Sequence, residues 1–259
     1  MKNVLLTNNG SLYGKRILKE FNKNNIVLSA IVVVLQPISY YWKLFRYVQR
    51  KVGISDAIYF VLIRSLKRPP VEKDLRNIAY EEFSENVFYV RGTNSQETIK
   101  SINAISPDLL ILGQTGIVHK KILSIPKVGT LNAHPGILPE YRGIDCPKWT
   151  VFQKEFDKLG CTVHWVDSGV DTGDIVAQET YQLKGNESLD DLEDRYINNL
   201  CVSKLSWVVK ELNCGRVLTG VRQNGGKQYY KMSRKYEKVA MFNLLKFRGD
   251  IPSVRVTEE

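Results

Sequence analysis

The sequence predicts an α/β fold: a mostly parallel, twisted sheet with helices on both faces. Residues 2–7 are an apolar, strand-like segment that leads through a turn with Gly10 into the amphipathic segment 12–21. This succession of strand, turn and helix is typical of the opening of a nucleotide-binding sheet. Residues 26–35 and 108–112 are apolar runs of strand length, as expected for parallel strands that are buried on both faces.

The rest of the chain alternates between strand and helix signals. We expect further strands over residues 86–90, 128–133, 161–166 and 175–179, and helices over residues 95–102, 147–156 and 188–212. Ser188 is a good N-cap for the last of these helices, and Asp190, Asp191 and Glu193 follow in its first turn, where the helix dipole favours negative charge. Cys214-Gly215 ends it.

The length of 259 residues favours one main domain with an appendage. We assign residues 1–215 to the main domain, with a basic helical insertion at about 40–70, and residues 216–259 to a small C-terminal extension. In that extension Asn224-Gly225-Gly226 is a hairpin signal, residues 228–231 resemble a short strand, and residues 235–247 resemble a helix.

Composition excludes several classes of protein. The 43% hydrophobic and 25% charged residues are ordinary for a globular domain, and no apolar run is long enough to span a bilayer. The four cysteines form no C-x-x-C pair and no signal peptide is evident, so we expect reduced thiols and a cytoplasmic protein. The three histidines lack zinc-type spacing, and we therefore expect no metal.

The net charge of +10 is concentrated in one segment. Residues 41–70 hold seven basic residues (Lys43, Arg46, Arg50, Lys51, Arg64, Lys67, Arg68) against Asp56 alone, a balance of +6. Aromatic residues are interleaved with these charges. A solvated or partner-packing helix face is the first interpretation, attraction to small anions the second, and contact with a membrane surface or RNA the last.

Three polar side chains suit acyl transfer to an amine. Asn132 and His134 are two residues apart at the end of a strand, so they project from one face at its carboxyl end, where open α/β sheets bind ligands. An amide N–H stabilises an oxyanion, and an imidazole relays protons near neutral pH. Asp171 lies in the glycine-bounded loop 167–173, and its carboxylate can orient and support the imidazole.

Taken alone, Asn-x-His and Asp-x-Gly are usually structural turns. The occurrence of both motifs in this order along the chain favours a functional site. Residues 132–143 read NAHPGILPEYRG, which resembles the signature N-x-H-P-S-L-L-P-x-Y-R-G of folate-dependent formyltransferases. Residues 160–174, GCTVHWVDSGVDTGD, resemble the second signature of that family. The likeness covers residues 107–178, with Gly136 where the family usually has Ser.

The resemblance implies a Rossmann-like formyltransferase fold that uses 10-formyltetrahydrofolate, with Asn132, His134 and Asp171 as the catalytic set. Residues 107–119 resemble the strand and loop that hold the pterin ring. The candidate folate contacts are Gln114, Gly116, Ile117, His119, Val170 and Asp174. Glycinamide-ribonucleotide formyltransferases bind substrate phosphate at the loop that matches residues 9–11. The candidate acceptor contacts are Asn9, Gly10, Ser11, Arg142 and Trp149.

Three acceptors fit the resemblance. Glycinamide-ribonucleotide formyltransferases are shorter and lack the basic insertion, and methionyl-tRNA formyltransferases carry a longer C-terminal barrel. Formyltransferases that act on a nucleotide-linked amino sugar for surface polysaccharide (O-antigen) resemble this chain in length. We favour that third acceptor, because aromatic rings stack on a base and cations face a diphosphate.

Other readings remain open. Hydrolysis of the same folate is a further enzymatic alternative, and an inactive basic module that binds nucleotide or RNA on the same scaffold is the non-enzymatic one. We expect a homodimer that forms through the insertion or the extension, and no stable nucleic-acid partner.

Overall fold

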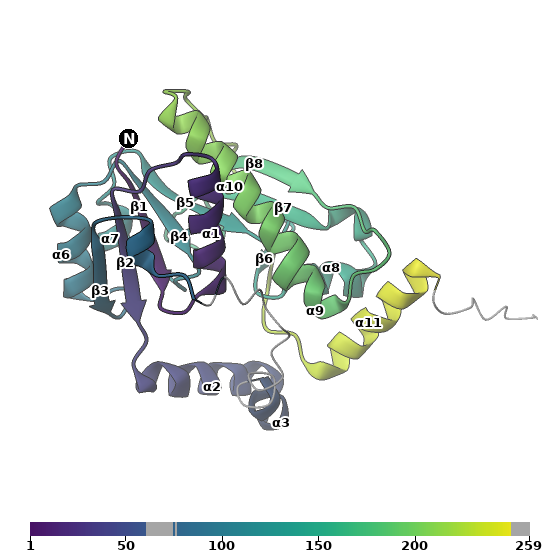
Figure 1. The fold of residues 1–259 in the computed structure, drawn as a ribbon. Helices are drawn as coiled ribbons and strands as arrows, with labels where there is room; N and C mark the ends of the chain where they lie inside the picture. Colours follow the sequence, from purple (N-terminus) through teal and green to yellow (C-terminus); the bar gives the residue numbers. More distant parts are fainter. Residues whose placement is uncertain (61–74, 76, 250–259) are drawn as a thin grey trace, which may run out of the picture.

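A computed structural model describes residues 1–60, 75 and 77–249 of the chain. Seven strands form its central sheet: β1 (Asn3–Asn8), β2 (Ala30–Leu35), β3 (Val87–Arg91), β4 (Leu109–Gly113), β5 (Gly129–His134), β7 (Gly160–Trp165) and β8 (Ile175–Thr180). They lie side by side in the order β3-β2-β1-β4-β5-β7-β8 (Figure 1).

The first five strands of this order run parallel, while β7 is antiparallel to β5 and β8 is antiparallel to β7. The predicted mostly parallel α/β fold is therefore confirmed. The second strand begins at Ala30 rather than at residue 26. Ile26 and Leu28 are buried, but they precede the hydrogen-bonded ladder.

Helices cover both faces of the sheet: α1 (Leu12–Lys23), α6 (Gln96–Ile105), α7 (Lys120–Leu123) and α10 (Asn198–Asn213). Successive side chains of a strand point to opposite faces, so an unbroken apolar strand supplies two cores. Leu5 and Ile31 join the cluster that contains residues of α1 and α10. Leu6 and Val32 join the cluster that contains residues of α6 and α7.

The predicted helix that begins after Ser188 is continuous but not regular. It consists of α9 (Leu189–Asp191), a π-helical turn (Leu192–Ile197) and α10. The Ser188 hydroxyl caps it by accepting the Asp191 N–H at 3.1 Å. A π-helical turn shifts the register of the side chains that follow it, and Glu193, Asp194 and Asn198 from this region line the cavity described below.

The C-terminal extension folds onto the signature segment. Here β6 (Tyr141–Gly143) pairs in parallel with β9 (Lys227–Tyr229), and α11 (Arg234–Arg248) packs against α8 (Cys146–Gln153). The predicted hairpin at residues 224–226 is wrong. Gly226 approaches the Pro139 carbonyl so closely that a Cβ there would lie 1.8 Å from its oxygen, so this glycine permits a tertiary contact. The predicted helix over residues 235–247 is confirmed, and the domain boundary at residue 215 stays a prediction.

The basic insertion is helical in its described part. Helices α2 (Ile38–Val52) and α3 (Ile54–Ile58) are separated by Gly53, whose φ of 88° interrupts the helical backbone. In Figure 1, α2 runs beyond the strand ends of the sheet, away from the helical layers. Asp56 accepts a hydrogen bond from the Arg234 side chain at 2.7 Å, which ties α3 to the extension. Residues 61–70 of the insertion lie outside the described residues.

Candidate active site

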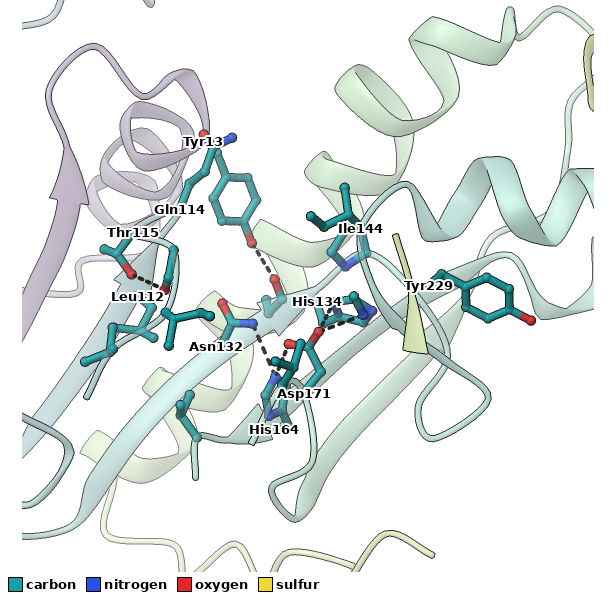
Figure 2. Close-up of a pocket in the computed structure, with 18 of the residues that line it drawn as sticks. Tyr13, Leu112, Gln114, Thr115, Asn132, His134, Ile144, His164, Asp171 and Tyr229 are labelled. Carbon is teal, nitrogen blue, oxygen red and sulfur yellow. Dashed lines mark hydrogen bonds and ion pairs between the residues drawn. The ribbon is translucent and has the colours of Figure 1, made fainter. Parts of the chain in front are cut away.

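The carboxyl end of β5 presents two polar side chains on one face. Asn132 and His134 alternate with Ala133, whose side chain belongs to the apolar core. In the antiparallel ladder with β7, Asn132 lies opposite His164, which adds a second imidazole to the same face. Figure 2 shows these three side chains and Asp171 pointing toward one another at the wall of a cavity.

Asp171 joins the group from the loop between β7 and β8. Its backbone is left-handed, with φ of 52°, and its side chain points toward the imidazoles of His134 and His164 (Figure 2). One carboxylate oxygen lies 3.5 Å from His134 Nδ1 and accepts the Gly143 N–H at 2.9 Å, and the other lies 3.6 Å from His164 Nε2. Burial raises the pKa of Asp171, but attraction to the two imidazoles in their protonated forms and the hydrogen bond from the Gly143 N–H outweigh burial and hold the pKa well below its ordinary value. The carboxylate is therefore ionised at neutral pH.

The tautomer of His134 follows from its neighbours. Its side chain is 3% exposed, and Nε2 lies 2.7 Å from the Tyr141 carbonyl oxygen, which can only accept. Nε2 therefore carries the hydrogen, and Nδ1 faces Asp171. Burial lowers the pKa of His134, and the Asp171 carboxylate opposes this. A neutral His134 is thus ready to take a proton on Nδ1, where the carboxylate would stabilise the charge.

Asn132 is oriented by His164. His164 Nδ1 lies 2.9 Å from the Trp165 carbonyl oxygen and donates to it, so its Nε2 is the acceptor in the neutral ring. The Asn132 amide donates one hydrogen to that nitrogen at 3.2 Å. An amide nitrogen has two hydrogens, so the second remains for an oxyanion in the cavity.

The cavity beside these side chains has a volume of about 500 Å³, within the usual range for small-molecule sites. Its walls combine the apolar side chains of Leu112, Val118, Val166 and Val170 with the loop that follows β4. Gln114 and Gly116 in that loop have positive φ, and the Asn8 side chain donates to the Gln114 carbonyl at 2.5 Å. The apolar walls and fixed loop backbone fit the flat, hydrogen-bonding pterin of a reduced folate.

Seven of the predicted site residues line this cavity: Asn132, His134, Asp171, Gln114, Gly116, Ile117 and Val170. Seven others do not: Asn9, Gly10, Ser11, His119, Arg142, Trp149 and Asp174. Ser11 donates to the Gln114 side chain at 3.0 Å. Arg142 and Trp149 donate to carbonyl oxygens of the extension, those of Gly226 and Tyr230 respectively. The roles assigned to these residues stay predictions.

The sequence reasoning missed several residues of the site. His164 lies inside the second signature, and the signal for it was its period-two position on a strand that neighbours Asn132. Tyr47 of the insertion and Gln228 and Tyr229 of the extension also line the cavity. The interleaved aromatic residues of the insertion indicated Tyr47 only as one of a group, and no local pattern marked the other two as site residues. Gln223 donates to the backbone carbonyls of Asp171 and Gly173, at 3.1 and 2.5 Å, and so holds the aspartate loop from outside the cavity.

Steric crowding explains why residue 136 is a glycine. A Cβ at this position would lie 2.8 Å from the Tyr141 carbonyl oxygen, 2.9 Å from His134 Nε2 and 3.0 Å from Cys146 Cβ. The contact between His134 and the Tyr141 carbonyl therefore leaves no room for a side chain. The replacement of the family's Ser by Gly is matched to the observed position of the imidazole.

Within the described ranges, no group of three His, Cys, Asp or Glu side chains could hold a metal ion. No helix within those ranges combines the length and the apolar character that a membrane crossing requires.

The fold and this strand-end cluster define an α/β domain of the Rossmann-like class with a group of polar side chains beside a cavity at the carboxyl edge of its sheet. Comparison with known proteins gives the family: residues 49–200 match the family model described as formyl transferase. The chain belongs to the formyl transferase family.

Similar sequences are methionyl-tRNA formyltransferases. The protein from Syntrophus aciditrophicus is 31% identical over 173 residues, 66% of this chain and 53% of that protein. The protein from Clostridioides difficile is 36% identical over 104 residues, 40% of this chain and 33% of that protein. The first relative is thus matched over about half of its length.

Several solved structures share the fold over a larger part of the chain than the similar sequences do. A sugar N-formyltransferase from a Shewanella species gives a TM-score of 0.57 at 13% identity, covering 95% of this chain and 88% of that one. A glycinamide ribonucleotide transformylase from Symbiobacterium toebii gives 0.55 at 19% identity, covering 88% and 95%. At these identities the likeness establishes the fold.

Proposed function

We propose that this protein transfers the formyl group of 10-formyltetrahydrofolate to the amine of a nucleotide-linked amino sugar, in the cytoplasm and for surface polysaccharide. The observation that carries the proposal is the convergence of Asn132, His134 and Asp171 on one cavity beside the loop 114–117. When bound, the folate supplies an activated formyl group. The protein supplies the charge stabilisation and the proton transfers.

Each residue has a distinct task in this reaction. The second N–H of Asn132 donates to the formyl oxygen as negative charge develops on it. Nδ1 of His134 takes the proton that the attacking amine loses and returns it to the departing nitrogen. The Asp171 carboxylate, 3.5 Å from that atom, stabilises the charged imidazole in between.

The walls of the cavity support a sugar acceptor. Three tyrosines, Tyr13, Tyr47 and Tyr229, line it together with the polar side chains of Asn198 and Gln228. Aromatic faces and amide groups suit a ring that bears hydroxyls and an apolar face. All three tyrosines come from outside the folate-binding signatures, where family members that use different acceptors can differ.

Methionyl-tRNA is the second candidate acceptor, because the similar sequences are methionyl-tRNA formyltransferases. The basic residues of α2 suit a polyanion as well as a nucleotide. The two acceptors are distinguished by direct assay.

The test is a mass-spectrometric screen of the purified chain with 10-formyltetrahydrofolate. Nucleotide-linked 3- and 4-amino sugars, methionyl-tRNA and glycinamide ribonucleotide are offered separately, and His134→Ala serves as the inactive control. We expect one amino sugar to gain the mass of a carbonyl in the wild-type reaction alone. Formylation of methionyl-tRNA only, or of no amine, would refute the sugar assignment, and failure to bind folate would favour the inactive binding module.

A further inference from the structure

A second cavity adjoins the reaction cavity. It has a volume of about 330 Å³ and lies beyond the carboxyl ends of β2 and β3. Thr115, Gly116 and Ile117 line both cavities, so one loop forms a shared wall. A ligand held in one cavity can therefore extend over this loop into the other.

Helix α2 borders both cavities with one face. Tyr40 and Lys43 line the second cavity, and Tyr47 lines the reaction cavity. Spacings of three and four residues place these side chains in a row along the helix. Helix α2 of the basic insertion thus forms a continuous wall along both cavities.

The two cavities differ in charge. Among the residues that the structure describes, four acidic side chains line the reaction cavity, those of Asp167, Asp171, Glu193 and Asp194, and no Lys or Arg does. The described lining of the second cavity has Lys43 and no carboxylate. Among the residues that the structure describes, the Lys43 ammonium has no hydrogen bond or ion pair, whereas Lys148 and Lys231 are engaged.

We infer that the second cavity binds the phosphate groups of the acceptor, while its amine lies in the carboxylate-lined reaction cavity. Lys43 makes the charge-assisted contact, and the hydroxyls of Ser39 and Tyr40 in the same lining are further donors. This inference rests on the proposed function and specifies it. The acceptor is a single molecule with a phosphate-bearing end and an amine-bearing end. The carboxylate tail of folate is the other source of an anion, and the test separates the two.

The test compares Lys43→Ala with the wild type by calorimetric titration of uridine diphosphate and of inorganic pyrophosphate. Loss of a charge-assisted contact weakens binding about tenfold. In the transfer assay we expect the KM for the amino sugar to rise about as much with kcat nearly unchanged, because Lys43 lies away from the reacting atoms. Tetrahydrofolate with one or four glutamates should bind both forms equally.

Arg50→Ala is the matched control. Arg50 is an exposed residue on the same helix that lines neither cavity, so its removal subtracts one positive charge without touching the site. Equal losses in the two variants, or no loss in Lys43→Ala, would overturn the inference. A loss confined to tetraglutamyl tetrahydrofolate would assign the cavity to the folate tail and overturn it as well. Pyrophosphate binding is measured without turnover, so this result is independent of whether any sugar is formylated.

Discussion

The candidate active site is built from two kinds of region. The strand ends of β5 and β7 supply Asn132, His134 and His164, which neighbouring main-chain hydrogen bonds hold in place. The insertion and the extension supply Tyr47, Gln228 and Tyr229, which come from distant parts of the sequence. In the proposed reaction the strand ends supply the groups that act on the formyl group, and the added segments form the wall against which the acceptor packs. We therefore expect changes in the first region to affect turnover and changes in the second to affect the choice and binding of the acceptor.

The largest effect is expected at the strand ends. Asn132→Ala removes the oxyanion donor, and His134→Ala removes the proton relay. Loss of one such donor lowers turnover about 10²–10³-fold. Single-turnover assays with the acceptor found in the screen would measure this, with circular dichroism to confirm folding. Near-normal turnover in either folded variant would show that the strand ends are not where the chemistry occurs.

Asp171→Asn should act through His134. Proton transfer by a positioned group contributes about 10²-fold or more, so the plateau of kcat should fall by about that factor. The carboxylate opposes the burial that lowers the pKa of His134. Its loss should therefore move the acid limb of the kcat/KM profile to lower pH. An acid limb that stays in place or moves to higher pH would contradict the pairing of Asp171 with His134.

The same residue predicts a dependence of stability on pH. The pKa of Asp171 is lower in the folded protein than in the unfolded chain, so its contribution is present above its ordinary pKa of about 3.9 and is lost as the pH falls below that value. The free energy of unfolding of the wild type should therefore fall more steeply below about pH 4 than that of Asp171→Asn. Urea denaturation at several acidic pH values would measure the difference. Parallel curves would contradict the depressed pKa.

Gln223→Met tests whether the extension contributes to the chemistry as well as to the wall. It keeps the length of the side chain but removes the two hydrogen bonds that hold the carbonyls of Asp171 and Gly173. We expect about a tenfold loss in kcat, because the left-handed backbone at Asp171 loses its support. Gln153→Met is the control, since Gln153 bonds to the Tyr229 hydroxyl at 2.5 Å and not to the aspartate loop. Equal effects of the two changes would indicate a general loss of stability.

The smallest effect is expected for Tyr47→Ala in the insertion. This change removes one aromatic side of the cavity, so we expect the KM of the acceptor to rise a few-fold while folate affinity and kcat stay near the wild type. Tyr41→Ala removes a tyrosine of the same helix that is 54% exposed and lines neither cavity. A large fall in kcat for Tyr47→Ala would break the division between chemistry and acceptor binding.

The sheet and the strand-end part of the site can be predicted from the sequence. The alternation of apolar strands and helices predicts the sheet, and the spacing of Asn132 and His134 predicts their common face. The hairpin predicted from Gly225-Gly226 is absent, because a glycine that permits a close tertiary contact cannot be distinguished in sequence from one that turns a hairpin. The sequence does not mark His164 as a site residue, because strand pairing brings it to Asn132, which lies 32 residues away in the chain.

By itself the sequence determined the fold class, the family signatures and the choice of the three candidate catalytic side chains, because periodicity and motif spacing are local properties. The tertiary structure decided which of the two His134 nitrogens faces Asp171, how Gln223 supports that carboxylate, and where Lys43 and Tyr47 lie. These depend on contacts between segments that lie tens of residues apart or more, such as the 52 that separate Asp171 from Gln223. Only the packed chain brings such groups within hydrogen-bonding reach.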